Sequence, residues 1–172
     1  INYGSVLYVN STLLKNHFPT ETVSILFVLG ALGNIFLFLI GPKLIEIFGK
    51  RLVLFISLIS VASATLVLAY STSSQMIAGS FLIYSSFFFI IYYILDIFLE
   101  EVSKNTQTGW IRGLYMTIMN LGIMIGPIIL AFSSVQDSLT PIYITAVIML
   151  LPAILISLFD LHSKNQKLHN YP

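Results

Sequence analysis

Long apolar runs alternate with short polar segments along the whole chain. A helix that crosses about 30 Å of hydrocarbon needs about 20 predominantly apolar residues. Five runs reach that length, and they are Val23–Gly41, Leu52–Tyr70, Met76–Leu99, Trp110–Phe132 and Pro141–Phe159. A membrane strand would need only about 9–11 residues of alternating polarity, and these runs are longer and more uniformly apolar. The pattern predicts an all-α bundle of transmembrane helices.

The two ends of the chain differ from these runs. Residues 1–14 form a shorter, mildly apolar stretch that starts at Ile1 and lacks the basic segment and cleavage site of a signal peptide. We interpret this stretch as the end of a first span, so residues 1–160 hold five complete spans and a partial one. Residues 161–172 are polar, and we expect a frayed cytoplasmic tail or the start of a linker.

The basic residues predict which way the spans run. Seven of the eight lie on alternate connections, and these are Lys43, Lys50, Arg51, Lys104, Arg112, Lys164 and Lys167. Only Lys15 lies on the other side. Cytoplasmic loops carry the excess of lysine and arginine. We therefore expect the C-terminal tail to be cytoplasmic and the chain to be integral to the plasma membrane or the bacterial cytoplasmic membrane.

Composition excludes several classes of function. The chain is 57% hydrophobic and 9% charged, whereas soluble domains carry about 25% charged residues. This excludes a soluble enzyme and a disordered chain, and a net charge of +1 offers no footprint for nucleic acid. There is no cysteine and no P-loop, and the three histidines lack metal-ligand spacing. We expect no catalytic residue, no metal and no cofactor.

The connection between the first two complete spans carries several charges. It reads Gly41-Pro-Lys-Leu-Ile-Glu46-Ile-Phe-Gly49-Lys50-Arg51. Gly49 permits a tight reversal, and the basic pair after it suits the anionic inner leaflet. Glu46 needs a cationic partner or a helix N-terminus, because lipid alone offers a carboxylate nothing there.

This connection resembles the loop signature of the major facilitator superfamily, Gly-x-x-x-Asp-Arg-x-Gly-Arg-Arg. Glu46 stands at the acidic position, Gly49 at the second glycine, and Lys50 and Arg51 at the basic pair. The sequence departs from the signature at Pro42, where the family has its first glycine, and at Ile47, where it has its first basic residue.

A second charged segment is similar to the corresponding loop of that family. Asp96, near the end of one span, is followed by a polar connection and by Arg112-Gly113 at the start of the next. We expect Glu46 and Arg112 to approach each other on one membrane face, although both could be independent interfacial charges. The expected charge network comprises Glu46, Lys50, Arg51, Glu100, Glu101 and Arg112.

A third segment, Asn120-Leu-Gly122-Ile-Met-Ile-Gly126-Pro127, resembles the Gly-x-x-x-Gly-Pro part of the family's motif in span five. The two glycines share a helix face, which permits close helix contact, and simple packing also accounts for them. The family's trailing glycines are replaced by Leu130 and Ala131, so the antiport subtype is not implied. We expect packing or bending roles for Gly41, Gly49, Gly122, Gly126 and Pro127.

Polar residues inside the spans are the candidates for a substrate or proton path. Ser85, Tyr92 and Asp96 are spaced by seven and four residues and share one helix face. Asp96 is an intramembrane carboxylate, which is a functional-site hypothesis by default, but it could equally pair with Arg112 or Lys104. The isolated amides of Asn34 and Asn120 either form hydrogen bonds between helices or line the path. The candidates are Asn34, Tyr84, Ser85, Tyr92, Asp96 and Asn120.

The resemblance implies the N-terminal six-helix half of a secondary transporter, built from three-plus-three inverted repeats that the sequence itself does not reveal. It implies alternating access for a small solute, with Glu46, Arg51, Glu100 and Arg112 gating the inner face. The implied partners are the lipid bilayer, a C-terminal half and an unidentified solute. The alternative is a half-length membrane protein with a structural or assembly role, associating through the span at 110–132.

Overall fold

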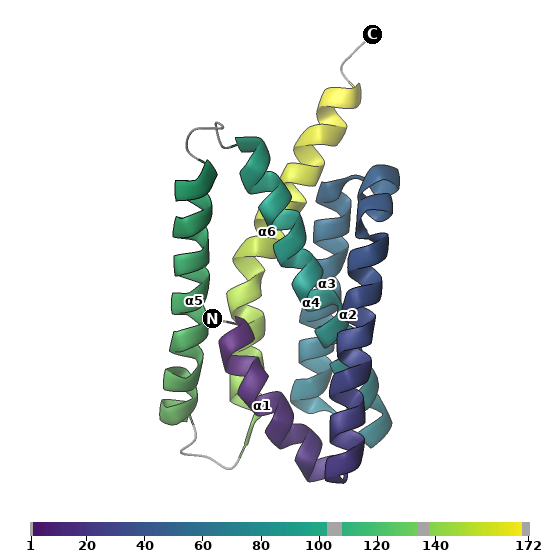
Figure 1. Cartoon of the computed structure of the whole chain (residues 1–172), viewed down its shortest axis with the longest axis vertical. Helices are drawn as coiled ribbons and strands as arrows, with labels where there is room; N and C mark the ends of the chain where they lie inside the picture. The colour runs from purple at the N-terminus through teal and green to yellow at the C-terminus, as the bar shows by residue number, and fades with distance from the viewer. Residues whose placement is uncertain (1, 103–107, 134–137, 170–172) are drawn as a thin grey trace.

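The computed structural model describes residues 2–102, 108–133 and 138–169, and the described chain is an all-α bundle (Figure 1). No strand occurs within these residues. The six helices are α1 (Asn2–His17), α2 (Thr20–Phe48), α3 (Lys50–Tyr70), α4 (Ser74–Val102), α5 (Thr108–Ser133) and α6 (Thr140–His169). The fold class predicted from the apolar runs is therefore confirmed.

Four of the described helices are long and apolar enough to cross a membrane. They are Thr20–Phe48, Lys50–Tyr70, Ser74–Glu101 and Thr140–Leu161. Helix α1, with 16 residues, is shorter than a span, and it runs from the middle of the bundle to one end (Figure 1). Helix α5 covers the fifth expected run.

The helices extend beyond the apolar runs at most of their ends. Helix α6 continues to His169, so the polar segment that begins at residue 161 is helical as far as that residue. The polar residues between Asp160 and His169 include no glycine or proline, and side chains such as lysine, glutamine and leucine lose little freedom in a helix.

Helices α2 and α3 are joined by a single residue. Gly49 has a φ of 80°, which favours glycine because a Cβ would be strained there. Its N–H donates to the carbonyl of Ile45 at 2.9 Å and so closes the last turn of α2. The tight reversal predicted at Gly49 is confirmed.

Helix α3 lies at the centre of the packing and contacts both α4 and α6 extensively. Its inner face carries Leu58, Val61, Ala64 and Leu68, all less than 5% exposed. The buried hydroxyl of Thr65 donates to the carbonyl of Val61 at 2.7 Å. That polar group is thus satisfied within its own helix and can sit in an apolar core.

The contacts between helices have an internal symmetry. If α1 is exchanged with α4, α2 with α5 and α3 with α6, every contacting helix pair maps onto a contacting pair, either a different one or itself. For example, α2 packs on α4 as α5 packs on α1, and α3 packs on α4 as α6 packs on α1. This is the contact pattern that two related three-helix units produce.

Large apolar side chains cover much of the outer surface. Exposed examples on α2 and α6 are Ile25, Val28, Phe36, Leu39, Ile148, Ile156 and Phe159. Apolar patches of this extent on a protein surface mark contact with lipid or with another protein, as the membrane assignment requires.

Candidate functional site

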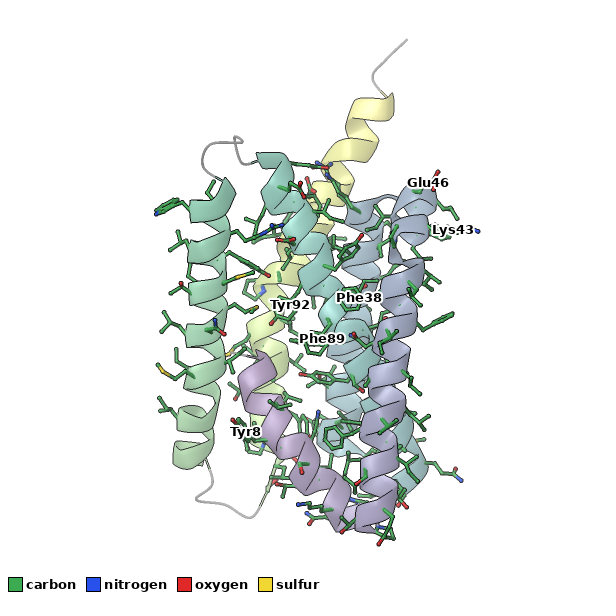
Figure 2. All side chains as sticks on the ribbon, in the orientation of Figure 1. Tyr8, Phe38, Lys43, Glu46, Phe89 and Tyr92 are labelled. Carbon is green, nitrogen blue, oxygen red and sulfur yellow. The ribbon has the colours of Figure 1, made fainter. Side chains whose placement is uncertain are left out.

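Three ion pairs between described residues lie at one end of the bundle, where α2 meets α3 and where α4 ends. We call it the charged end (Figure 2). The pairs are Lys50–Glu101, Arg51–Asp160 and Arg112–Asp96. They join α3 to α4, α3 to α6 and α5 to α4, so four helices are tied together at this end.

The pair between Arg112 and Asp96 has two parallel hydrogen bonds. The guanidinium Nε donates to Oδ1 at 2.9 Å and Nη2 donates to Oδ2 at 2.6 Å. Bidentate pairs of this kind fix geometry as well as adding energy. Glu100, on the same helix as Asp96, adds electrostatic attraction for Arg112. Of the two roles left open for Asp96, the structure therefore places it in the ion pair.

Glu46 does not take the position expected of it. It is exposed near the end of α2, where Figure 2 places it together with Lys43. Its expected partner, Arg112, contacts Asp96 instead. The reason is that α2 and α5 lie on opposite sides of the bundle (Figure 1) and do not touch within the described residues.

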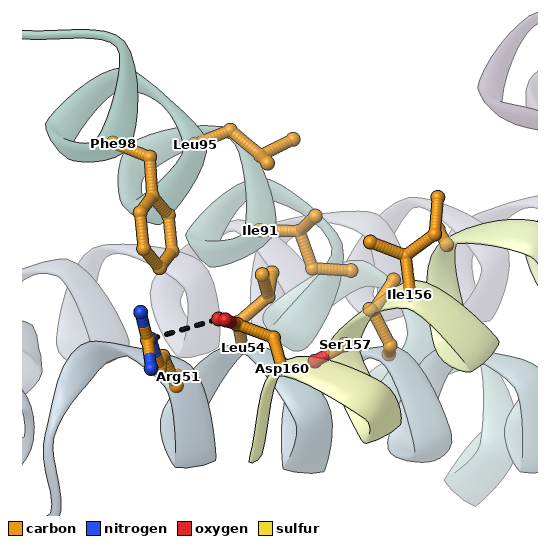
Figure 3. A pocket seen from close by; sticks show the side chains of 10 residues that line it. Arg51, Leu54, Ile91, Leu95, Phe98, Ile156, Ser157 and Asp160 are labelled. Carbon is orange, nitrogen blue, oxygen red and sulfur yellow. Dashed lines mark ion pairs between the residues drawn. The ribbon is translucent and has the colours of Figure 1, made fainter. Parts of the chain in front are cut away.

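An apolar cavity of about 350 Å³ lies beside the pair of Arg51 and Asp160 (Figure 3). Arg51 Nε and Asp160 Oδ2 are 2.7 Å apart, and Phe98 and Leu54 lie next to them. The buried hydroxyl of Ser157 borders the cavity and has no partner among the described residues.

A second cavity, of about 290 Å³, lies between α1, α2 and α4, and we call it the mid-depth cavity. Asn34 borders it at the middle of α2, equally far from Thr20 and Phe48. Tyr84 and Ser85 border it from α4. Three of the six residues predicted for a substrate or proton path are thus brought together here.

Aromatic rings form most of the remaining wall of the mid-depth cavity. The rings of Phe27 and Phe81 meet edge to face, with centroids 4.9 Å apart. Tyr84 stacks on Phe88 at 5.4 Å, and Phe89 meets Phe88 edge to face at 5.6 Å. The first contact joins α2 to α4, and the other two lie within α4.

The polar groups around the mid-depth cavity differ in how they are satisfied. The hydroxyl of Ser85 donates to the carbonyl of Phe81 within α4. Asn10, 3% exposed, accepts a 2.8 Å hydrogen bond from the hydroxyl of Tyr143. The amide nitrogen of Asn34 is buried and has no partner within the described part of the chain. An unpaired buried donor of this kind is costly, and an acceptor beside it would remove that cost.

Helices α2 and α4 approach closely beside this cavity because α2 carries glycines there. A Cβ on Gly30 would collide with the hydroxyl of Ser85, and a Cβ on Gly33 would collide with that of Ser86. Small residues at such contacts let membrane helices pack with little distance between their backbones.

The family model described as Major Facilitator Superfamily matches residues 1–170. The chain belongs to this superfamily. Members of this superfamily are membrane transporters. The broad functional class that the charged segments indicated, a membrane transporter, is therefore confirmed. Comparison with curated proteins and with solved structures found no match.

Other predicted residues of this facilitator-superfamily chain lie away from the mid-depth cavity. Tyr92 borders a wider cavity of about 700 Å³ between α4, α5 and α6. Asn120 is exposed on α5, and it does not border the mid-depth cavity. Lys104 lies outside the described residues.

Three of the predicted packing residues occupy buried positions, whereas Gly49 is only partly buried at its turn. Gly41 packs against the ring of Tyr93, and Gly122 and Gly126 are buried on α5. Pro127 lies within the same helix, and its bending role stays a prediction.

Sequence reasoning missed several residues of this facilitator-superfamily site. Asp160 was not among the predicted charge-network residues, although an acid at the end of a span is a signal for pairing with a basic loop. Asn10 lies in the partial first span, and Tyr143 lies in an ordinary apolar run. Their contact joins residues 133 positions apart, which no local pattern reveals.

Proposed function

We propose that this chain is the N-terminal six-helix half of a secondary active transporter that moves a small solute by alternating access. The supporting observation is the separation of two kinds of polar group. Ion pairs gather at one end of the bundle, whereas uncharged hydrogen-bonding groups border a cavity at mid-depth. Sites near the middle of the membrane between two halves are typical of such transporters.

The ion pairs are suited to a gate that opens and closes. Each pair is partly exposed, with side chains between 23% and 55% accessible. Exposed ion pairs contribute about 0–1 kcal/mol each, so they can be broken and remade during a conformational cycle. Together, Lys50, Arg51, Arg112 and their acidic partners would hold the charged end closed while the cavity is open to the other side.

Glu46 and Glu100, which the resemblance also assigns to this gate, have different surroundings. Glu100 is close enough to attract Arg112 and fits the proposal. Glu46 is exposed at the periphery of the charged end, where it is available to a partner outside this chain. In the proposed gate it therefore acts between halves and not within this one.

Accessibility of a cysteine in the cavity tests alternating access. The chain has no cysteine, so Ala31→Cys, which lies on the cavity wall, gives a single reporter in the full-length protein. We expect Arg112→Ala to raise its rate of labelling by an impermeant thiol reagent from the charged end about threefold. The change is expected to be small because an exposed ion pair, screened by solvent, contributes little to holding the end closed.

The matched control is Lys15→Ala, which removes an exposed basic residue at the opposite end and should leave the rate unchanged. Labelling from the opposite side should fall in Arg112→Ala. Equal rates from both sides in the parent and in both variants would contradict alternating access. Solute uptake that stays unchanged in Arg112→Ala at equal expression would contradict the gating role.

An assembly role through α5 lacks support from the residues that motivated it. Gly122 and Gly126 are buried within the chain, and α5 packs mainly on α1. The small-residue face is therefore already used inside the bundle. The exposed side chains of α5, such as Ile118 and Met124, offer no equivalent close-contact face.

A further inference from the structure

The mid-depth cavity is bordered by aromatic and uncharged side chains only. Among the residues that the structure describes, no lysine, arginine, aspartate, glutamate or histidine borders it. The closest acid further along α4 is Asp96, 11 residues beyond Ser85, which is about 16 Å at 1.5 Å per residue. That carboxylate is already paired with Arg112. A charged group placed in this cavity would lose its hydration without gaining an opposite charge from this chain.

The aromatic wall of the cavity is partly accessible. Phe27 and Phe89 are 37% and 38% exposed and stand on two different helices, α2 and α4. Both already meet neighbouring rings edge to face. A ring from a solute could extend the same arrangement, since aromatic pairs in edge-to-face or offset geometry gain more than the burial of their area alone provides.

Among the buried side-chain polar atoms of the described residues that border the cavity, one has no hydrogen-bond partner, and it is a donor. The amide nitrogen of Asn34 is buried without a partner in the described chain, while the hydroxyl of Ser85 and the carbonyl of Asn10 are satisfied by protein groups. A buried donor without a partner favours a ligand that supplies an acceptor. Asn34 therefore selects for an acceptor oxygen on whatever part of a solute enters this cavity.

We propose that the mid-depth cavity takes the part of the transported solute that is uncharged, carries an aromatic ring and presents an acceptor oxygen to Asn34. This proposal rests on the transport function proposed above and narrows its substrate class. The ring would lie between Phe27 and Phe89, and the oxygen would accept from Nδ2 of Asn34.

A set of four matched probes tests the proposal. The full-length protein in nanodiscs is dialysed to equilibrium against radiolabelled phenylacetamide, phenylacetate, phenethylammonium or cyclohexylacetamide, with binding to empty nanodiscs subtracted. We expect phenylacetamide to bind, and the two charged probes to bind at least about tenfold more weakly, because a charge loses its hydration there. Cyclohexylacetamide, which has no aromatic ring, should bind about threefold more weakly.

Variants of the cavity wall assign the binding to these residues. Asn34→Leu should weaken phenylacetamide binding about fivefold, whereas Asn16→Leu, the same change at an exposed position, should leave it unchanged. Phe89→Leu should weaken it about threefold, and Phe36→Leu, on the outer face of α2, should not. Asn34→Asp should shift the preference toward phenethylammonium, which provides a gain of binding that a misfolded variant cannot give.

Equal binding of all four probes, no binding above empty nanodiscs, or an affinity unchanged by Asn34→Leu and Asn34→Asp would overturn the proposed substrate class. These outcomes are separable from failure of the transport function. If the labelling of Ala31→Cys still depends on the side of the membrane while the probes fail, only the substrate class is wrong. If that dependence is lost, the transport proposal itself fails.

Discussion

At the scale of single residues, the contact between Tyr143 and Asn10 has a structural role that its neighbours in the cavity do not share. Tyr143 is fully buried and Asn10 is 3% exposed, and their hydrogen bond joins α6 to α1. Asn34 could be predicted as a cavity residue because an amide in an apolar run has no lipid partner. Nothing in the sequence marks Tyr143, because the side chain that satisfies it lies far away along the chain.

We expect Tyr143→Phe to lower the free energy of unfolding by about 1 kcal/mol. The change leaves the buried carbonyl of Asn10 without its donor, which costs about 1–3 kcal/mol in proteins generally, although hydrogen bonds between membrane helices average only about 0.6 kcal/mol. Unfolding by SDS in mixed micelles measures this change in the free energy of unfolding. Tyr8→Phe, at a side chain 55% exposed, is the control, and equal stability of both variants would refute a structural role for this bond.

At the scale of helices, α5 is attached to the bundle in two places of different character. Its first turn is held to α4 by the pair of Arg112 and Asp96, and further along it packs closely on α1. A Cβ on Gly4 would collide with the backbone of Ile123. The sequence predicted close packing from Gly122 and Gly126, but the partner helix could not be predicted, because glycine spacing identifies a face and not what lies against it.

Gly4→Ala should therefore destabilise the protein by about 1–2 kcal/mol, since the added methyl group meets backbone that cannot move aside without separating α1 from α5. Gly79→Ala, on α4, is the matched control, because nothing lies within 4 Å of the added atom. Alanine there should leave stability unchanged or raise it by up to about 1 kcal/mol. The same SDS titration compares the two variants, and an equal response of both would refute the close approach of α1 and α5.

At the scale of the whole molecule, α1–α3 and α4–α6 are related by an internal symmetry. Exchanging each helix of the first unit with its counterpart in the second leaves the set of contacting helix pairs unchanged. The apolar runs were sufficient to predict the number of helices and their approximate extents. They were not sufficient for the symmetry, because it resides in which faces meet and not in matching residues. The wrong partner expected for Arg112 has the same origin, since two loops on one membrane face need not belong to neighbouring helices.

The distribution of basic residues over the whole molecule predicts its orientation in the membrane. Among described residues, Lys43 (Figure 2) and the ion-paired Lys50, Arg51 and Arg112 lie toward the charged end. Lys15 lies in the last turn of α1, which reaches the opposite end of the bundle (Figure 1). Because short cytoplasmic connections carry the excess of basic residues, the charged end should face the cytoplasm. The reporters are single cysteines at exposed positions near opposite ends, Glu46→Cys and Ser73→Cys, and neither removes a basic residue.

An impermeant maleimide should label Ser73→Cys in intact cells and Glu46→Cys only in inside-out vesicles. The cysteine-free parent provides the background for both measurements. Labelling of Glu46→Cys in intact cells would place the charged end outside, where its basic residues would lie away from the anionic inner leaflet. The gate proposed above would then close the outer face, so this measurement also decides from which side the mid-depth cavity is reached while the ion pairs are formed.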